Sequence, residues 1–162
     1  MKRSLYVIFA LVGMLLLTSG IQASANVLIG VIDIDRVMDE SDAGKLANED
    51  LGQLIAGWQA TLDSLEATIV ELQETNPDSE ELPALIEDYQ IAAAEGEHAI
   101  QQRADELYLL LLQDIAMIAR IIGERDGYTI IAETASLFYY ESQVDISADV
   151  ILEYNRLLNE SE

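Results

Sequence analysis

Two long stretches of the chain carry apolar residues at helical spacing. In the first, steps of four and three residues separate Leu51, Ile55, Trp58, Leu62, Leu65, Ile69 and Leu72. The second stretch contains Leu82, Ile86, Tyr89, Ala93, Ile100, Ala104, Leu107, Leu111, Ile115, Ile118 and Ile122. A repeat of this kind keeps one apolar seam on the side of a helix that faces a partner helix. The pattern therefore predicts two long helices with coiled-coil character.

The dipeptide Asn76-Pro77 separates the two stretches. A residue that precedes proline is disfavoured in helical geometry, so we expect the first helix to end there. Because the seams lie on either side of this break, the chain is expected to fold back into an antiparallel helical hairpin over residues 42–125. Arms of roughly 34 and 43 residues would extend about 50 to 65 Å, far beyond the size of a compact domain.

Capping residues mark the expected ends of the two helices. Ser41 or Asp42 can cap the first helix, because short polar side chains accept hydrogen bonds from the free N–H groups of a first turn. Asp78, followed three residues later by Glu81, is typical of a capping box for the return helix, whereas Pro83 is typical of a first turn. The sequence alone does not decide between Ser41 and Asp42 as the cap of the first helix, or between Asp78 and Pro83 as the mark of the start of the return helix.

The return helix changes character along its length. Gly96 occupies a seam position, which should lie opposite the stretch from Trp58 to Leu62 if the two arms align about the tip. A glycine there fits either close packing beneath the tryptophan or, with Gly52 and Gly57, a pliable arm. Residues 107–122 add apolar side chains off the seam, among them Leu109, Leu110, Leu112 and Met117. A helix that is apolar around most of its circumference is buried on several sides, so we expect the hairpin to meet a body here.

Short β-branched runs flank the hairpin. Val27 to Ile34 is almost continuously apolar, which is typical of a strand buried on both faces. Gly127 is expected to end the return helix as a left-handed cap. Tyr128 to Glu133 and Leu137 to Tyr140 are predicted as a second and a third strand, joined as an antiparallel hairpin through residues 134–136.

A final amphipathic helix is predicted near the C-terminus. Ser147 is expected to cap it. Its apolar residues recur at helical spacing, at Val150, Ile151, Tyr154, Leu157 and Leu158. The expected fold class is α+β, with the long hairpin arm of residues 42–125 on a small β-rich body made by residues 26–41 and 126–162. This body is too small to be stable alone, so we expect subunits to share it.

The first 25 residues are organised like a secretory signal peptide. Lys2 and Arg3 precede an apolar run from residue 5 to residue 17, and Ala23-Ser24-Ala25 offers a small-residue cleavage site. A run of this length is too short to span a bilayer as a mature helix. We therefore expect cleavage after Ala25 and a mature chain outside the cytoplasm. No cysteine follows the run, which excludes a lipid-modified N-terminal cysteine.

The mature chain is expected to be strongly acidic. The sequence has 8 basic and 30 acidic residues, and cleavage removes Lys2 and Arg3 alone, so the formal charge becomes 6 − 30 = −24. Affinity for nucleic acids and anionic membranes comes from Lys and Arg side chains at phosphates, so this charge argues against both partners. Most of the acids are expected to form a solvated surface.

Residues that could carry catalysis or bind metal are few. The chain has no cysteine and one histidine, His98, which excludes thiol catalysis and sites built from several histidines. His98 follows Glu97 on a polar stretch and is expected to be solvated rather than a general base. Asp33, Asp35 and Asp39 lack the alternation and the central glycine of a calcium loop. The sequence predicts no enzyme, no cofactor and no metal site.

Motifs at both ends of the mature chain resemble those of a known family. V-L-I-G-V-I-D-I-D at Val27 precedes the hairpin, and E-R-D-G-Y-T-I-I-A-E at Glu124 and V-D-I-S-A-D-V-I-L-E-Y-N at Val144 follow it. Together with the signal peptide and the long hairpin, these motifs resemble the Skp/OmpH-like periplasmic chaperones. The resemblance covers essentially the whole mature chain and is strongest at its two ends.

The resemblance implies a homotrimer with a shared body, from which three hairpin arms project like tentacles around a cavity. It also implies an ATP-independent holdase, which binds unfolded outer-membrane β-barrel proteins in the periplasm and prevents their aggregation. A structural or adaptor coiled-coil protein of the cell envelope is the alternative. By the same resemblance, the candidate residues of the trimer body are Ile29, Val31, Ile130, Phe138, Tyr140, Ile146, Val150 and Tyr154.

The negative charge departs from the best-known relatives, which are basic. Their positive arms attract acidic clients and the phosphates of lipopolysaccharide, so lipopolysaccharide binding is not expected for this chain. Client capture should then depend more on apolar side chains off the seam. The candidates are Leu54, Val70, Leu85, Ile91 and Leu110. Ordinary packing between helices or subunits is the alternative for each of them.

Overall fold

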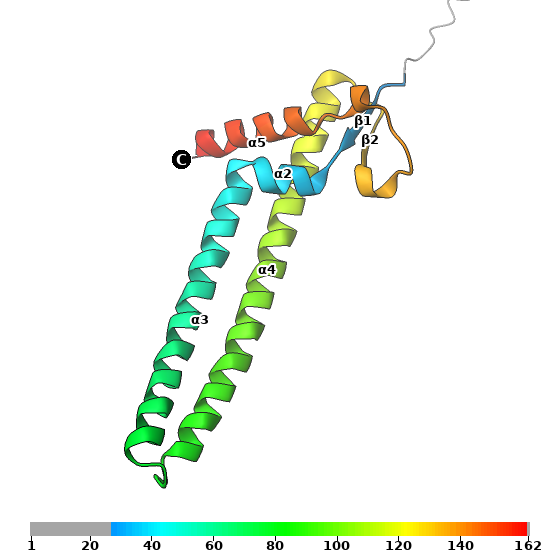
Figure 1. Ribbon diagram of the computed structural model, residues 1–162. Coiled ribbons are helices and arrows are strands. Elements are labelled where there is room, and N and C mark those ends of the chain that lie inside the picture. The colour runs from blue at the N-terminus through cyan, green and yellow to red at the C-terminus, as the bar shows by residue number, and fades with distance from the viewer. Residues whose placement is uncertain (1–26, 162) are drawn as a thin grey trace, which may run out of the picture.

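The computed structural model describes residues 27–161 (Figure 1). The expected signal peptide, with its cleavage site after Ala25, lies outside these residues. In chain order the elements are β1 (Ile29–Ile32), α2 (Ile34–Glu40), α3 (Asp42–Thr75), α4 (Leu82–Asp126), β2 (Ile130–Glu133), the 3-10 helices η2 (Thr134–Ser136) and η3 (Ser142–Val144), and α5 (Ser147–Ser161). Among the helices of this part, none has the length and apolar character needed to cross a membrane.

Helices α3 and α4 form the predicted hairpin and extend together away from the other elements (Figure 1). They contain 34 and 45 residues, which correspond to about 51 and 68 Å at a rise of about 1.5 Å per residue. The predicted break is confirmed, because Asn76 is the C-cap of α3 and its N–H donates to the carbonyl of Leu72.

The helix ends confirm most of the predicted caps. Ser41 caps α3, since its hydroxyl accepts a hydrogen bond from the N–H of Gly44 at 3.1 Å. Gly127 ends α4 in the left-handed conformation, with φ of 80°. At the start of α4, Pro83 lies in the first turn, and the capping box of Asp78 is wrong. A separate turn, closed by a bond from the Leu82 N–H to the Ser79 carbonyl, places Asp78 before the helix start.

The sheet consists of two parallel strands. Ile29 of β1 lies opposite Ile130 of β2, and Ile32 lies opposite Glu133. Parallel strands need a long crossover connection, which α2 and the whole hairpin supply here. On its other side, β1 makes a single bridge from Val31 to Asp145.

The predicted third strand, Leu137 to Tyr140, is not formed, and the antiparallel pairing with Tyr128 to Glu133 is wrong. Residues 134–136 form η2 instead of a tight β-turn, so the following segment is not laid beside β2. The four side chains from Leu137 to Tyr140 are exposed, Phe138 completely. The body of a single chain is therefore mostly helical with a two-stranded sheet, and the expectation of a β-rich body is wrong at this level.

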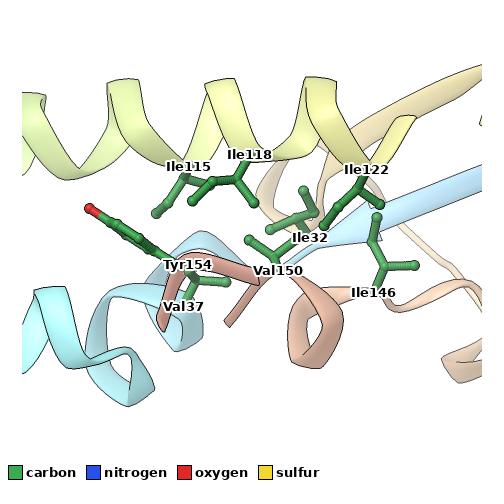
Figure 2. Packing of buried hydrophobic residues seen from close by; sticks show 8 residues of the cluster. All are labelled: Ile32, Val37, Ile115, Ile118, Ile122, Ile146, Val150 and Tyr154. Carbon is green, nitrogen blue, oxygen red and sulfur yellow. The ribbon is translucent and has the colours of Figure 1, made fainter. Parts of the chain in front are cut away.

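The hydrophobic core lies where the hairpin meets the body (Figure 2). Its residues come from β1, α2, α4 and α5 and from the segment before α5, and none is more than 6% exposed: Ile32, Val37, Ile115, Ile118, Ile122, Ile146, Val150 and Tyr154. Burying a side chain of this size stabilises the fold by about 1.5–3 kcal/mol. The three α4 isoleucines therefore anchor the base of the long arm.

Helix α5 lies across the base of the hairpin, against α2, α3 and α4 (Figure 1). The prediction that Ser147 caps this helix is wrong, because Ser147 is already its first residue. Its N–H donates to the carboxylate of Asp145 at 2.8 Å, and its hydroxyl accepts from the N–H of Asp33 at 2.9 Å. The Asp145 carboxylate thus accepts a hydrogen bond from the first turn of α5, and the Ser147 hydroxyl links α5 to the end of β1.

A buried carboxylate joins α5 to the end of α4. The Glu153 side chain is 7% exposed, and it accepts hydrogen bonds from Arg156 at 2.7 Å and from Arg125 at 3.1 Å. The bond from Arg156, together with that from Arg125, outweighs the effect of burial and holds the pKa of Glu153 below its ordinary value of about 4.5. The two arginines therefore favour the ionised form of this carboxylate in the folded chain.

We expect Glu153→Gln to reduce the acid sensitivity of the fold. A carboxylate whose pKa is lowered by folding stabilises the native state above its unfolded pKa, and this contribution is lost as the pH falls through the folded pKa. Below about pH 4.5, the wild-type free energy of unfolding should therefore fall more steeply than that of the variant. Urea unfolding followed by circular dichroism at several pH values measures both slopes.

The matched control for this experiment is Glu124→Gln. Glu124 is an exposed partner of Arg120, at 2.9 Å, and exposed ion pairs contribute little to stability. This control should follow the wild type over the whole pH range. Equal acid slopes for Glu153→Gln and the wild type would remove the proposed role of the Glu153 carboxylate.

Candidate functional site

The seam between α3 and α4 differs from the predicted one at two positions. On α3, half-buried apolar residues recur at Leu51, Leu54, Trp58, Leu62, Leu65, Ile69 and Leu72. Leu54 thus replaces Ile55, which is 44% exposed, and on α4 Leu85 replaces Ile86, which is 37% exposed. A residue four positions before Trp58 lies about 40° from it around the helix, and one three positions before lies about 60° away. The residue four positions back is therefore closer to the seam.

Trp58 packs over Gly96 midway along the hairpin. A Cβ atom at Gly96 would lie 3.0 Å from the indole ring of Trp58, so close packing accounts for this glycine. A groove of about 320 Å³ beside this contact is lined in part by Ile55, Leu62 and Ile100. Packing does not account for the glycines at 52 and 57, because a Cβ atom at either position would meet nothing within 4 Å.

Three of the five client-binding candidates present apolar surface to solvent. Val70 is 45% exposed, Ile91 is 49% exposed and Leu110 is 51% exposed. Leu54 and Leu85 are half-buried at seam positions, so packing between the helices accounts for them. Ile55 and Ile86, assigned to the seam from the sequence, are exposed instead. Where two apolar residues are adjacent in the sequence, their angular positions around the helix relative to the next seam residue are the signal that shows which of the two is exposed.

An ion pair near the body connects the two arms. Nε of Arg103 on α4 lies 2.7 Å from a carboxylate oxygen of Asp50 on α3, and a second bond of 2.7 Å joins Arg103 to Glu106. The hydrogen bonds to Asp50 and then to Glu106 raise the pKa of Arg103 above its ordinary value. This ion pair shows which residues of the two arms lie opposite each other near the base of the hairpin.

The base of α4 is covered on one side only. Ile115, Ile118 and Ile122 face the core (Figure 2). The expected burial on several sides is not reached within one chain, since other apolar residues here are between 36% and 63% exposed: Tyr108, Leu109, Leu110, Met117 and Ile121. This part of the molecule therefore carries an uncovered apolar face.

An apolar groove of about 490 Å³ lies between α4 and the sheet. Its apolar lining includes Ile34, Leu112, Ala119, Gly123, Tyr128 and Ile131. Arg120, Glu124 and Glu133 contribute polar side chains to the same groove. The groove and the uncovered face of α4 lie on the same stretch of that helix.

The candidate residues of the trimer body fall into two groups. Four of them are buried in the core of the single chain: Val31, Ile146, Val150 and Tyr154. The other four are between 37% and fully exposed: Ile29, Ile130, Phe138 and Tyr140. Ile29 and Ile130 are direct neighbours across the sheet. Tyr139, which sequence reasoning left out of the set, is 79% exposed.

Candidate metal ligands do not gather at one place within the described residues. Within residues 27–161, no group of three or more His, Cys, Asp or Glu side chains could hold a metal ion. Asp33 caps α2, since its carboxylate accepts from the N–H of Arg36 at 3.0 Å. His98 is exposed on α4. The Tyr154 hydroxyl donates to Asp114 at 2.8 Å, and burial, followed by this bond, raises its pKa.

Known proteins share both the sequence pattern and the fold. The family model described as outer membrane protein (OmpH-like) matches residues 28–154. One similar solved structure is the crystal structure of an OmpH-like protein from Caulobacter crescentus CB15, with a TM-score of 0.51 and 12% sequence identity. The similarity covers 86% of this chain and 90% of that chain. At this identity it concerns the fold alone. No curated protein matches the sequence.

Proposed function

The chain belongs to the OmpH-like outer membrane protein family, and from this premise we propose that it is an ATP-independent holdase chaperone of the periplasm. It binds unfolded outer-membrane β-barrel proteins and prevents their aggregation. The observation that carries the proposal is the family match over residues 28–154, which includes both arms and most of the body. In this proposal, cleavage after Ala25 releases the mature chain into the periplasm.

A homotrimer with a shared body is part of the proposal. A parallel sheet is normally covered on both faces, and two strands alone are marginally stable. Here β2 pairs only with β1, and the segment from Leu137 to Tyr140 is irregular and exposed without a strand partner in residues 27–161. The uncovered face of α4 supports the same conclusion. Neighbouring chains would cover these surfaces, and the three hairpins would then surround a cavity.

Clients are held, in this proposal, by exposed apolar side chains of the arms. Val70, Ile91 and Leu110 are the candidates that the single chain leaves exposed. Contacts of this kind are non-directional, which suits the binding of many unfolded sequences. Leu54 and Leu85 contribute by holding the two arms together.

The holdase proposal is tested by refolding a denatured β-barrel protein with and without the mature chain. Light scattering follows aggregation, and the mass of the chaperone is measured in the same buffer by multi-angle scattering. We expect suppression of aggregation at a ratio near one trimer per client. No suppression at a threefold molar excess of trimer would overturn the proposal. Binding of one folded envelope protein without suppression would favour the adaptor alternative.

Replacing Val70, Ile91 and Leu110 together with serine should weaken client holding. Each side chain loses part of an apolar contact worth about 1.5–3 kcal/mol when fully buried, so we expect roughly tenfold more chaperone to be needed for the same suppression. Light scattering during refolding measures this ratio.

The control for this variant is Leu152→Ser on α5. Leu152 is 71% exposed but lies outside the arms. It should suppress aggregation as well as the wild type. Helical content should be unchanged in both variants, because these side chains are exposed in the single chain. Oligomeric mass is measured for both variants as well, because Leu110 belongs to the face of α4 that a neighbouring chain would cover in the proposed trimer. Full activity of the triple variant would exclude these residues as the client-binding surface.

A further inference from the structure

The basic residues of the described chain lie in the body and near the base of the hairpin. They are Arg36, Lys45, Arg103, Arg120, Arg125 and Arg156. We call residues 51–102 the distal arms; they contain no lysine or arginine. Their 11 carboxylates are Asp63, Glu66, Glu71, Glu74, Asp78, Glu80, Glu81, Glu87, Asp88, Glu95 and Glu97. Charge is therefore segregated along the molecule, although a merely solubilising surface normally intersperses both signs.

No basic residue of the described part of the chain neutralises the carboxylates of the distal arms. Every ion pair in residues 27–161 uses one of the six basic residues and a carboxylate outside the distal arms. Like charges three or four residues apart on a helix repel each other by a few tenths of a kcal/mol. A cationic partner would relieve this repulsion, whereas an anionic partner would add to it.

An exposed aliphatic side chain lies among these carboxylates on α3. Val70 is 45% exposed, and Glu66 and Glu74 lie four residues before and after it, which makes them its neighbours on the helix surface. A shallow groove of about 510 Å³ passes over this face and is lined by Asp63, Glu66, Ala67, Val70, Glu71 and Glu74. The groove thus has apolar side chains at its centre and carboxylates around them.

The same arrangement recurs on α4. Ile91 is 49% exposed, and its neighbours on the helix surface are Glu87, Asp88 and Glu95, at four and three residues before it and four after. None of these three carboxylates has a basic partner in the described chain. Each arm therefore carries an apolar contact point surrounded by unpaired negative charge.

We propose that the distal arms select unfolded segments in which apolar side chains are flanked by lysine or arginine. Val70 and Ile91 contact the apolar side chain, and the surrounding carboxylates pair with the flanking cations. This inference rests on the proposed holdase function and names the class of client that the arms hold. Charge complementarity of this kind raises the association rate and excludes partners of the wrong sign.

Two unfolded reporter peptides of equal length and equal apolar content test the inference on the wild-type mature protein. One carries lysine beside each apolar residue, and the other carries glutamate. We expect the basic reporter to bind roughly tenfold more tightly at low ionic strength, with the difference shrinking at high salt because the charges are then screened. Fluorescence anisotropy of labelled reporters measures both dissociation constants.

A neutralised variant identifies the surface that makes the selection. It carries Asp63→Asn, Glu66→Gln, Glu71→Gln, Glu74→Gln, Glu87→Gln, Asp88→Asn and Glu95→Gln. It should bind both reporters with similar affinity. A control variant neutralises four exposed carboxylates of the body, Asp35, Asp39, Glu141 and Asp149, and should keep the preference of the wild type. Because the reporter comparison uses the wild type, it decides the inference even when the neutralised variant folds poorly.

The reporter experiment can contradict the inference and the holdase proposal separately. Equal affinity for both reporters at low salt, with aggregation still suppressed, would overturn the inference and leave the holdase proposal standing. A lysine peptide without apolar residues that binds as tightly as the basic reporter would also overturn it, since the contact would then be unspecific charge attraction. If the protein bound neither reporter and also failed to suppress the aggregation of a β-barrel client, the holdase proposal itself would be overturned.

Discussion

Gly44→Ala should destabilise the fold by about 3 kcal/mol or more. Gly44 lies in the first turn of α3, buried where α2 passes the start of the hairpin. A Cβ atom on it would lie 1.5 Å from the carbonyl oxygen of Met38 and 2.6 Å from the carbonyl carbon. These are backbone atoms, which cannot rotate away as a side chain would. The α2–α3 corner must therefore open, which separates Val37 from the core.

Two other glycines of the same helix provide the control with the opposite sign. A Cβ atom at Gly52 or Gly57 would meet nothing within 4 Å, and alanine is a better helix former than glycine by up to about 1 kcal/mol. Gly52→Ala and Gly57→Ala should therefore raise the free energy of unfolding by roughly 0.5–1 kcal/mol. Urea unfolding followed by circular dichroism measures all three variants. An unchanged midpoint for Gly44→Ala would show that the corner adapts to the methyl group.

The hairpin could be predicted from the sequence because its determinants are local. The spacing of apolar residues, the geometry before Pro77 and the φ of Gly127 act within a few residues of each other, and no distant contact changes their effect. The seam register was wrong only at Leu54 and Leu85. Adjacent apolar pairs occur at these positions, so the pattern alone allows two alignments.

The sheet could not be predicted, because strand pairing depends on segments far apart in the chain. β1 pairs with β2 across the whole hairpin, and its second neighbour, Asp145, lies still further along. The apolar segment after η2 has the composition of a strand, but composition does not provide a partner edge. Its side chains therefore stay exposed within residues 27–161.

The exposure of the candidate residues could be predicted only in part, for a related reason. Apolar composition identified Val70, Ile91 and Leu110, which are exposed, but it also selected Leu54 and Leu85, which the partner helix covers. In the body, Ile29 and Ile130 are exposed although both belong to strands. Composition indicates that a residue will be buried, but it does not indicate whether its own chain or a neighbouring subunit covers it.

Ile130→Asp should leave the single chain folded and abolish the proposed trimer. Ile130 is 54% exposed on β2, so aspartate there remains hydrated in a monomer and costs at most about 1 kcal/mol in strand propensity. If the sheet continues across subunits, the same carboxylate would be buried without a partner, which costs several kcal/mol. In a symmetric trimer this cost occurs three times. Sedimentation should therefore show a roughly threefold lower mass, with helical content retained.

Ile91→Asp is the matched control, because Ile91 is exposed to a similar degree, at 49%, but lies on the distal arm. Its mass should remain that of the wild type. Loss of assembly in Ile130→Asp should also remove the suppression of client aggregation, since a single hairpin cannot enclose an unfolded chain. A wild-type mass for Ile130→Asp would place the subunit contact elsewhere, and the uncovered face of α4 at Met117 and Ile121 would be the next surface to substitute.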